Sequence, residues 1–318
     1  LDDYITDAGI NLADFNGITD QVTVDGSLYE LPFRSDYWLI YYNKDVFDAA
    51  GIAYPSNDMT MEDYDALARQ LTDTTYGSQV YGCHYHTWRS AVELFGILDG
   101  KHSILDGNYD WMIPYYDMIL SEEDDGVCQT YTDLSTEGLH YSAAFSNGNV
   151  AMMNMGSWFI STLISNLDSG EYDSSLCGNW GIASYPHPDG AEAGSTIATI
   201  TGLAVTSASA NKDAAFDFVN WVSGTEGAKV MASTGNFPAI MTDDVINTIA
   251  GMAGFPTDEG SKEALNITNA YLEVPYAENV SEINSILDTY HTSIMNREVT
   301  VEEGVASMNE QVGKILNQ

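Results

Sequence analysis

Segments with strand-like and helix-like patterns alternate along this chain, and the clearest strand is the run at 34–43, RSDYWLIYYN. Its hydrophobic, aromatic and β-branched residues predict a buried strand. The helix expected from about Asp45 to Ala50 stops at Gly51, because glycine readily ends a helix. Residues 22–32 predict a hairpin that turns at Asp25-Gly26. This alternation is typical of an α/β fold.

Capping residues and apolar spacing predict several further helices. Thr60 with Asp63 predicts a capping box, in which Asp replaces the usual Glu, at the start of a helix over 60–71. A helix is also expected after Asn211, with Ala214, Ala215, Phe218, Val219 and Val222 facing the core. The last helix carries an apolar face with residues three or four apart, namely Val301, Val305, Met308, Val312 and Ile315.

The charge balance excludes whole classes of partner. The chain has 47 acidic residues against 10 Lys and Arg, a formal net charge of −37. Nucleic acids are bound by basic residues that replace counterions, so a nucleic acid would be repelled. Docking on anionic lipid is disfavoured for the same reason. No uninterrupted run of about 18 apolar residues exists, so no transmembrane helix is expected.

The cysteines and histidines form no recognisable metal motif. Cys83, Cys128 and Cys177 are far apart in the sequence, and neither one disulfide with a leftover thiol nor three free thiols is excluded. His84 and His86 have no third ligand close in sequence, so neither a metal nor a cofactor is predicted. The acidic run at 122–125 is expected to be a solvated loop.

No catalytic motif is present. The sequence contains no GxSxG, no HExxH, no phosphate-binding glycine loop and no dinucleotide fingerprint. A glycosidase would need two carboxylates that flank the scissile bond, and nothing nominates such a pair among 47 acids. The chain is therefore predicted not to be an enzyme, with a carbohydrate-active enzyme kept as the alternative of another class.

Four blocks of sequence resemble one family. They are similar to the sugar-binding, maltose-binding-protein-like branch of the extracellular solute-binding proteins of ABC transporters. Met61 stands where that family usually has Trp. The blocks occur in the family's order and cover nearly the whole chain: LYELPFRSDYWLIYYNKDVFDAAGI at 28–52, TMEDYDALARQL at 60–71, AFSNGNVAMMNMGSWFISTL at 144–163, and 178–190 followed by 202–228 and 232–239.

The resemblance implies an α/β fold of the two-lobe, type II periplasmic-binding-protein kind, whose lobes close over a ligand about hinge crossovers. The family's opening strands, signal peptide and lipid-attachment cysteine have no counterpart in this sequence. The chain is therefore expected to be an N-terminally truncated member with an incomplete first lobe. The implied division is 1–41 for the remainder of the N-terminal lobe, 42–184 for the C-terminal lobe, 185–240 for the hinge return and N-terminal lobe, and 241–318 for helices of the C-terminal lobe.

The resemblance also implies a function. The chain would be the extracytoplasmic subunit of an ABC importer that binds a sugar or oligosaccharide and delivers it to membrane permease subunits. It would be a monomer, extracellular or periplasmic, and a cell-surface lipoprotein whose lipid anchor lies outside this chain. Two other ligands stay open. A polyamine would suit the acidic charge. Ferric ion is held by tyrosine pairs in some relatives, and this sequence has two such pairs, Tyr41-Tyr42 and Tyr115-Tyr116.

Sugar recognition needs aromatic rings for the apolar sugar face and polar side chains for the hydroxyls. Trp158, after Gly156-Ser157, matches the family's stacking tryptophan, although a core role is the alternative. Asp36 matches an acidic ligand of sugar hydroxyls, or else it forms a structural salt bridge with Arg34. Tyr37 and Trp38 point to opposite faces of their strand, so at most one of them faces the ligand.

Three further groups of candidates complete the predicted site. Tyr85, Trp88 and Arg89 lie in an aromatic segment that matches one from which the family supplies side chains to the cleft. A strand edge that faces ligand in the family is matched by Thr199, Thr201 and Gly202. Asn284 on a late helix is added with less support from the sequence.

Overall fold

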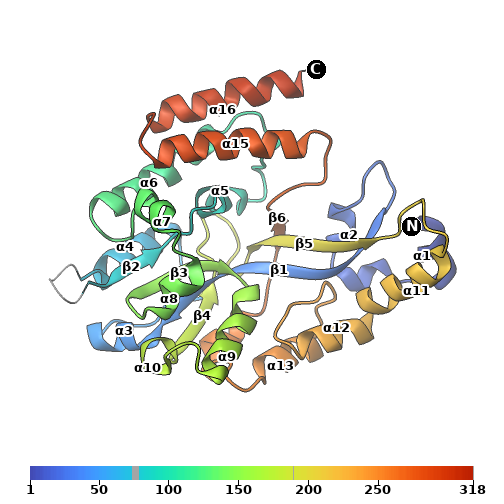
Figure 1. Cartoon of the computed structure of the whole chain (residues 1–318), viewed down its shortest axis with the longest axis horizontal. Helices are drawn as coiled ribbons and strands as arrows, with labels where there is room; N and C mark the ends of the chain where they lie inside the picture. Colours follow the sequence, from blue (N-terminus) through green and yellow to red (C-terminus); the bar gives the residue numbers. More distant parts are fainter. Residues whose placement is uncertain (74–78, 189, 318) are drawn as a thin grey trace.

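The computed structural model describes residues 1–73, 79–188 and 190–317. A curved mixed sheet runs through the middle of the molecule and helices cover it on both sides (Figure 1). The strands have the order β2-β3-β1-β5-β6, and β4 also pairs with β1. Their bounds are β1 Glu30–Asn43, β2 Tyr81–His84, β3 Val150–Gly156, β4 Trp180–Ser184, β5 Thr196–Ala204 and β6 Ala270–Leu272.

The long strand β1 connects the two parts of the sheet. Its first half pairs antiparallel with β5, up to Tyr37 opposite Ala198. From Trp38 onward it pairs with β3 on one side, and from Leu39 with β4 on the other. The predicted buried strand at 34–43 is confirmed, since every residue in it except the half-buried Arg34 is buried. Trp38 therefore marks the junction at which the β5 part of the sheet meets the part formed by β3 and β4.

Helices surround the sheet on all sides. The pair α15 and α16 packs over α5, α6 and η2, while α11 and α12 lie at the opposite end, near the N-terminus (Figure 1). None of the helices in the described parts of the chain is long and apolar enough to span a bilayer. The bounds are α1 Asp2–Ala8, η1 Leu12–Phe15, α2 Ile18–Gln21, α3 Lys44–Ala50, α4 Met61–Leu71, α5 Ser90–Ile97, η2 Asp110–Met112, α6 Ile113–Asp124, α7 Tyr131–Glu137, α8 Tyr141–Ser146, α9 Trp158–Ser169, α10 Ser174–Cys177, α11 Lys212–Ser223, α12 Thr225–Ala232, α13 Asp243–Ala250, α14 Glu259–Glu263, α15 Val280–Met295 and α16 Val301–Leu316.

Most of the local predictions are confirmed. Gly51 ends α3 with a φ of 69°, in the left-handed region that glycine favours. Thr60 and Asp63 form the capping box of α4. The turn at Asp25-Gly26 has positive φ at both residues, as a type I′ turn requires, although only one bridge flanks it. The predicted apolar face of α16 is buried along its whole length.

Two predictions about burial are wrong. On α11 the buried residues are Phe216, Val219 and Ser223, whereas Phe218 is 61% exposed, because the core-facing stripe is rotated from the predicted one. Glu122 and Glu123 do not lie in a solvated loop. They occupy the last turns of α6 and are buried, since that end of the helix packs inward against β2.

The range predicted for the C-terminal helices contains more than helices. Strand β6 lies inside 241–318 and pairs with β5, so this range also contributes to the part of the sheet that the first half of β1 joins.

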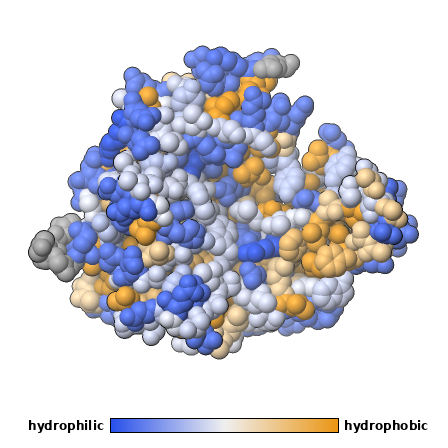
Figure 2. All heavy atoms as spheres, viewed as in Figure 1, coloured by the Kyte–Doolittle hydropathy of each residue, from blue (hydrophilic) through white to orange (hydrophobic). Residues whose placement is uncertain are grey.

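Hydrophobic residues gather over the end of the molecule where α11 lies (Figure 2). On α11 the exposed apolar side chains are Phe218 and Trp221.

Candidate functional site

A cavity of about 360 Å³ opens where β1 changes partners. Its lining residues come from elements far apart in the sequence: β1, the loop before α5, α5 itself, the start of α9, β5, the segment after β6, and α15. A second cavity of about 620 Å³ adjoins it and shares Thr199, Glu273 and Val274 with it. The two together form a groove along β5 that is large enough for a small ligand.

Three tryptophans form one wall of the cavity. The ring of Trp158 lies 5.5 Å from that of Trp38 and 6.3 Å from that of Trp88, measured between centroids. Trp38 is buried beneath the other two, whereas Trp88 is 41% exposed. The Trp158 indole N–H donates to the Tyr141 hydroxyl at 3.1 Å, which fixes the ring in place. A rigid, partly exposed indole surface of this kind can stack on an apolar ligand face.

The turn between β3 and α9 explains how Trp158 reaches the cavity. The Trp158 ring lies over Gly156, where an added Cβ would come within 2.1 Å of the ring, so the position requires glycine. The Ser157 hydroxyl donates to Asp36 at 3.0 Å and accepts the Tyr37 backbone N–H at 3.2 Å. These bonds join α9 to β1 and hold the ring at the junction.

The opposite wall is polar and is organised by Arg89. Its guanidinium forms an ion pair with Glu93 at 2.5 Å and donates to the Asn284 backbone carbonyl at 3.0 Å. It also contacts the side chains of Asp288 and Asn284. Burial by itself lowers the pKa of Arg89. The negative charges of Glu93 and Asp288 raise this pKa by more, so the net shift is upward. The group is therefore a permanent buried cation that links α5 to α15.

His291, one turn beyond Asp288 on α15, also lines this wall. Its Nδ1 lies 3.0 Å from the Tyr116 hydroxyl. Burial, together with the charge of Arg89, lowers the pKa of His291 to about 3. The imidazole is therefore neutral at physiological pH, and it packs behind the cavity wall with its Nδ1 beside the Tyr116 hydroxyl.

Glu273 stands at the boundary between the two cavities. Its carboxylate accepts a hydrogen bond from Thr199 on β5 at 3.0 Å and another from Ser90 at the start of α5. Glu273 follows β6 directly, and its carboxylate thus connects strand β5 to the start of helix α5. A ligand in the groove would compete for these bonds or add to them.

The structure brings half of the predicted site residues together. Trp38, Trp88, Arg89, Trp158, Thr199 and Asn284 all line the cavity.

The other six lie outside it. Tyr37 points to the opposite face of β1 and contacts Phe237. Tyr85 is buried in the core beside Tyr64 and Phe95. The remaining four are on β1 and β5 away from the cavity: Arg34, Asp36, Thr201 and Gly202.

Arg34 and Asp36 form the salt bridge that the sequence left open, with Nε 2.6 Å from Oδ2. Burial raises the pKa of Asp36, although Arg34 and Ser157 oppose this shift. Arg34 Nη2 also donates to Asp36 at 3.1 Å, so the two side chains are paired with each other. Their position beside Ser157 gives them a role in holding the β3–α9 turn.

The prediction from the sequence missed several residues that line the cavity. Glu273, Asp288, Ser90 and Glu93 belong to it. A signal existed for two of them, because Glu93 is four residues after Arg89 and Asp288 four residues after Asn284 in helical segments, so each pair shares a face. Nothing in the sequence around Glu273 distinguishes it from the many other acids.

Comparison with known proteins identifies the class. Residues 1–229 match the model of the bacterial extracellular solute-binding proteins. A sugar transporter protein from Rhizobium etli, solved in an open conformation, is 47% identical with a TM-score of 0.90, over 98% of this chain and 78% of that one. The chain belongs to the bacterial extracellular solute-binding protein family. Members of this family bind solutes and are not enzymes.

More distant solved structures share the fold. An ABC substrate-binding protein from Listeria monocytogenes, in complex with cycloalternan, is 21% identical with a TM-score of 0.77, covering 98% of this chain and 76% of that one. The sugar-binding protein MalE from Xanthomonas citri is 19% identical with a TM-score of 0.72, covering 99% and 78%. A search of curated proteins finds no match. The fold is the mixed α/β, type II periplasmic-binding fold that the sequence predicts.

Proposed function

We propose that this chain is the sugar-binding subunit of an ABC importer and that it binds a neutral sugar or oligosaccharide in the groove between the tryptophan wall and the Arg89 wall. The observation that supports this most directly is the geometry of the cavity. One wall offers a partly exposed indole surface, and the other offers hydroxyl, amide and carboxylate groups. A pyranose presents the matching pair of surfaces. The relative with 47% identity is named as a sugar transporter.

The partners that the cavity acids already have favour a neutral ligand over a polyamine. Glu93 and Asp288 are both bonded to Arg89, and Glu273 accepts two hydroxyl donors, so each carboxylate is engaged within the protein. A polyamine site would need acids without such partners. Ferric ion is disfavoured as well, because neither predicted tyrosine pair lines the cavity.

Binding would be coupled to closure of two lobes. The change of partners in β1 at Trp38 and the bridging position of Glu273 support a crossing there, close to the boundary predicted between 1–41 and 42–184. On this proposal, residues 185–240 return through the hinge. A ligand that contacts both sides of the groove stabilises the closed form by its higher affinity for it.

The remaining parts of the proposal concern location and partners. The family is extracellular, so this subunit works outside the cytoplasm and passes its sugar to the membrane permease subunits of the importer. We propose that it does so as a monomer tethered to the cell surface by a lipid anchor. The net charge of −37 supports the monomer, because copies of so acidic a chain repel one another.

The test is a ligand screen by thermal shift, followed by titration calorimetry on the chain itself. The panel contains mono- and oligosaccharides, spermidine and ferric citrate. We expect a saccharide to raise the melting temperature and Trp88→Ala to weaken its binding by about 1–3 kcal/mol, roughly 5- to 150-fold in Kd, because the exposed ring stacks on the ligand.

The matched control is Trp221→Ala, which removes an exposed indole from α11, far from the cavity. It should leave the affinity unchanged. A saccharide that binds both variants and the parent equally would remove Trp88 from the site. Stabilisation by spermidine or ferric citrate alone would overturn the proposal that the ligand is a sugar.

A further inference from the structure

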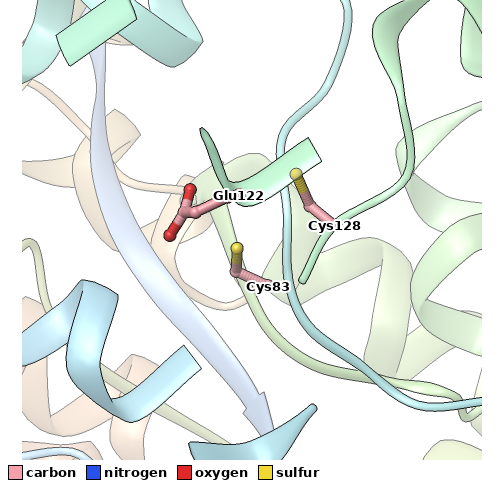
Figure 3. Close-up of side chains that lie close together, drawn as sticks. All are labelled: Cys83, Glu122 and Cys128. Atoms are coloured by element: carbon pink, nitrogen blue, oxygen red, sulfur yellow. The ribbon is translucent and has the colours of Figure 1, made fainter. Parts of the chain in front are cut away.

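Three side chains with metal-binding chemistry meet in the core, away from the proposed sugar site (Figure 3). They are Cys83 on β2, Glu122 near the end of α6, and Cys128 just beyond that helix. One ligand atom from each residue lies within 4.8 Å of the other two. Ligands at about 2.0–2.3 Å in a tetrahedron are about 3.3–3.8 Å apart, so the three atoms would have to draw together by at most about 1.5 Å to hold one small cation.

The fold itself brings the cluster together. After α6 the chain turns back, with the Val127 N–H donating to the Glu122 carbonyl at 2.8 Å. The Val127 carbonyl then accepts the Cys83 N–H at 3.4 Å, which lays this segment beside β2. Cys128 therefore arrives next to Cys83, although 45 positions separate them in the sequence, and α6 places Glu122 beside them (Figure 3).

The cluster is fully buried. Cys83 and Glu122 are 0% exposed and Cys128 is 2% exposed. Neither carboxylate oxygen of Glu122 has a hydrogen bond of regular geometry within the described parts of the chain, although the Tyr85 hydroxyl and the Asp65 carboxyl lie within hydrogen-bonding reach of it. The hydroxyl oxygens of Tyr64 and Tyr85 also have no such partner. Buried polar groups without partners are costly, so a group of them in one place points to a ligand.

The basic residue that acts on this cluster does not neutralise it. Arg69 affects both Glu122 and Cys128 electrostatically. Its guanidinium, however, forms ion pairs with Asp65 at 2.8 Å and with Asp125 at 2.6 Å. Its guanidinium is therefore already engaged by those two acids.

We propose that Cys83, Cys128 and Glu122 bind one thiophilic divalent cation, for which Zn²⁺ is the natural choice. Two thiolates and one carboxylate form a donor set that zinc accepts in tetrahedral sites, with the fourth position taken by water or by the nearby Tyr85 hydroxyl. Binding displaces the thiol protons and any carboxyl proton to solvent, and no electron is transferred. The cation gives Glu122 the partner that it lacks.

A disulfide between the two cysteines explains less. It would account for the sulfur atoms but would leave the Glu122 carboxyl and the Tyr85 hydroxyl as they are, buried and without regular hydrogen bonds. It would also need an oxidant. A cation bound by all three residues satisfies the whole cluster at once, and it would fix the end of α6 to β2, directly before the loop that holds Trp88.

The experiment uses the complete chain without a histidine tag, reduced, stripped with EDTA and desalted. Zn²⁺ is titrated in competition with a chromophoric chelator, and Co²⁺ is added as a spectroscopic probe. We expect one ion per chain, a thiolate-to-cobalt charge-transfer band, and a higher melting temperature with Zn²⁺. Cys83→Ser and Cys128→Ser should lose the band and at least about tenfold in affinity. Glu122→Gln should bind more weakly while keeping the band.

Cys177→Ser is the matched control, because Cys177 is also buried but lies outside the cluster. It should bind Zn²⁺ like the parent. If the variants do not fold, X-ray absorption at the zinc edge of the unsubstituted protein still decides, since two sulfur ligands support the site and a shell of only nitrogen and oxygen overturns it. A Cys83–Cys128 disulfide in protein purified without reductant, or zinc affinity unchanged in both serine variants, would also overturn it. None of these outcomes depends on sugar binding.

Discussion

Two buried clusters in this protein contain acids of the same kind in opposite circumstances. At the cavity, Glu93 is fully buried and is bonded twice by the buried guanidinium of Arg89, which also holds Asp288 and Asn284. In the core between β2 and α6, Glu122 is equally buried but faces two cysteines and a tyrosine, and among the described residues no basic side chain is bonded to it. The first cluster contains its own cation, whereas the second is made of acidic and neutral groups.

The difference shows how a chain with only 10 basic residues distributes them. A buried carboxylate is stable when a cation and hydrogen bonds replace its lost hydration. Arg89 supplies both at the wall of the proposed sugar site, and this leaves the wall rigid before any ligand arrives. Where the chain supplies no cation, the carboxyl must stay protonated or take its charge partner from solution.

The strongest way to break the comparison is to remove the cation from the first cluster. Arg89→Met leaves Glu93 buried without its partner and should lower the free energy of unfolding by about 3–5 kcal/mol. Denaturant unfolding of the variant and the parent measures this. The control is Arg69→Met, whose side chain is one-third exposed and should lose less than about 1 kcal/mol. Equal losses in the two variants would show that burial of the Arg89 network contributes nothing special.

A second test uses the pH dependence of the same network. The pKa of His291 falls from 6.5 to about 3 on folding, so the unfolded chain binds its proton more readily between these values. The stabilising contribution of the neutral ring is complete above pH 6.5 and is lost as the pH falls below it. At pH 5 the loss is roughly 2 kcal/mol.

His291→Asn removes this titration. The free energy of unfolding of the variant, measured from pH 7 to pH 5, should therefore fall less steeply than that of the parent, whatever its absolute value. Parallel curves would mean that His291 titrates normally and that the wall is more open to solvent than its burial indicates.

The smallest effect is expected in the second cluster, in the absence of metal. Glu122→Gln in the presence of EDTA replaces a carboxyl that lacks a charge partner by a neutral group of the same shape, so stability should change by less than about 1 kcal/mol at neutral pH. Chemical denaturation of the two proteins, both treated with EDTA, measures it. A loss as large as that of Arg89→Met would mean that Glu122 has a strong partner within the chain.

Much of the architecture could be predicted because it depends on neighbours in sequence. The capping box at Thr60, the stop at Gly51, the strand through 34–43 and the apolar face of α16 follow from local rules and are present. The prediction for α11 failed because Phe218 and Phe216 are equally apolar, and only the packing partner decides which of them turns inward.

The residues of the predicted site show the same contrast between local patterns and tertiary contacts. Resemblance to a family led to Trp158 and Trp88, and alternation along β1 required that at most one of Tyr37 and Trp38 face the cavity. Neither could place Glu273 beside Thr199, because the contact joins residues 74 positions apart.

By itself, then, the sequence determined the α/β class, the helix ends and the family, since each depends on residue patterns within single segments. The tertiary structure alone decided that Tyr85 belongs to the core, that Arg89 is tied to α15, and that Cys83, Glu122 and Cys128 meet. The physical reason is that a buried charge or thiol is defined by what surrounds it, and those surroundings come from segments that only the folded sheet brings together.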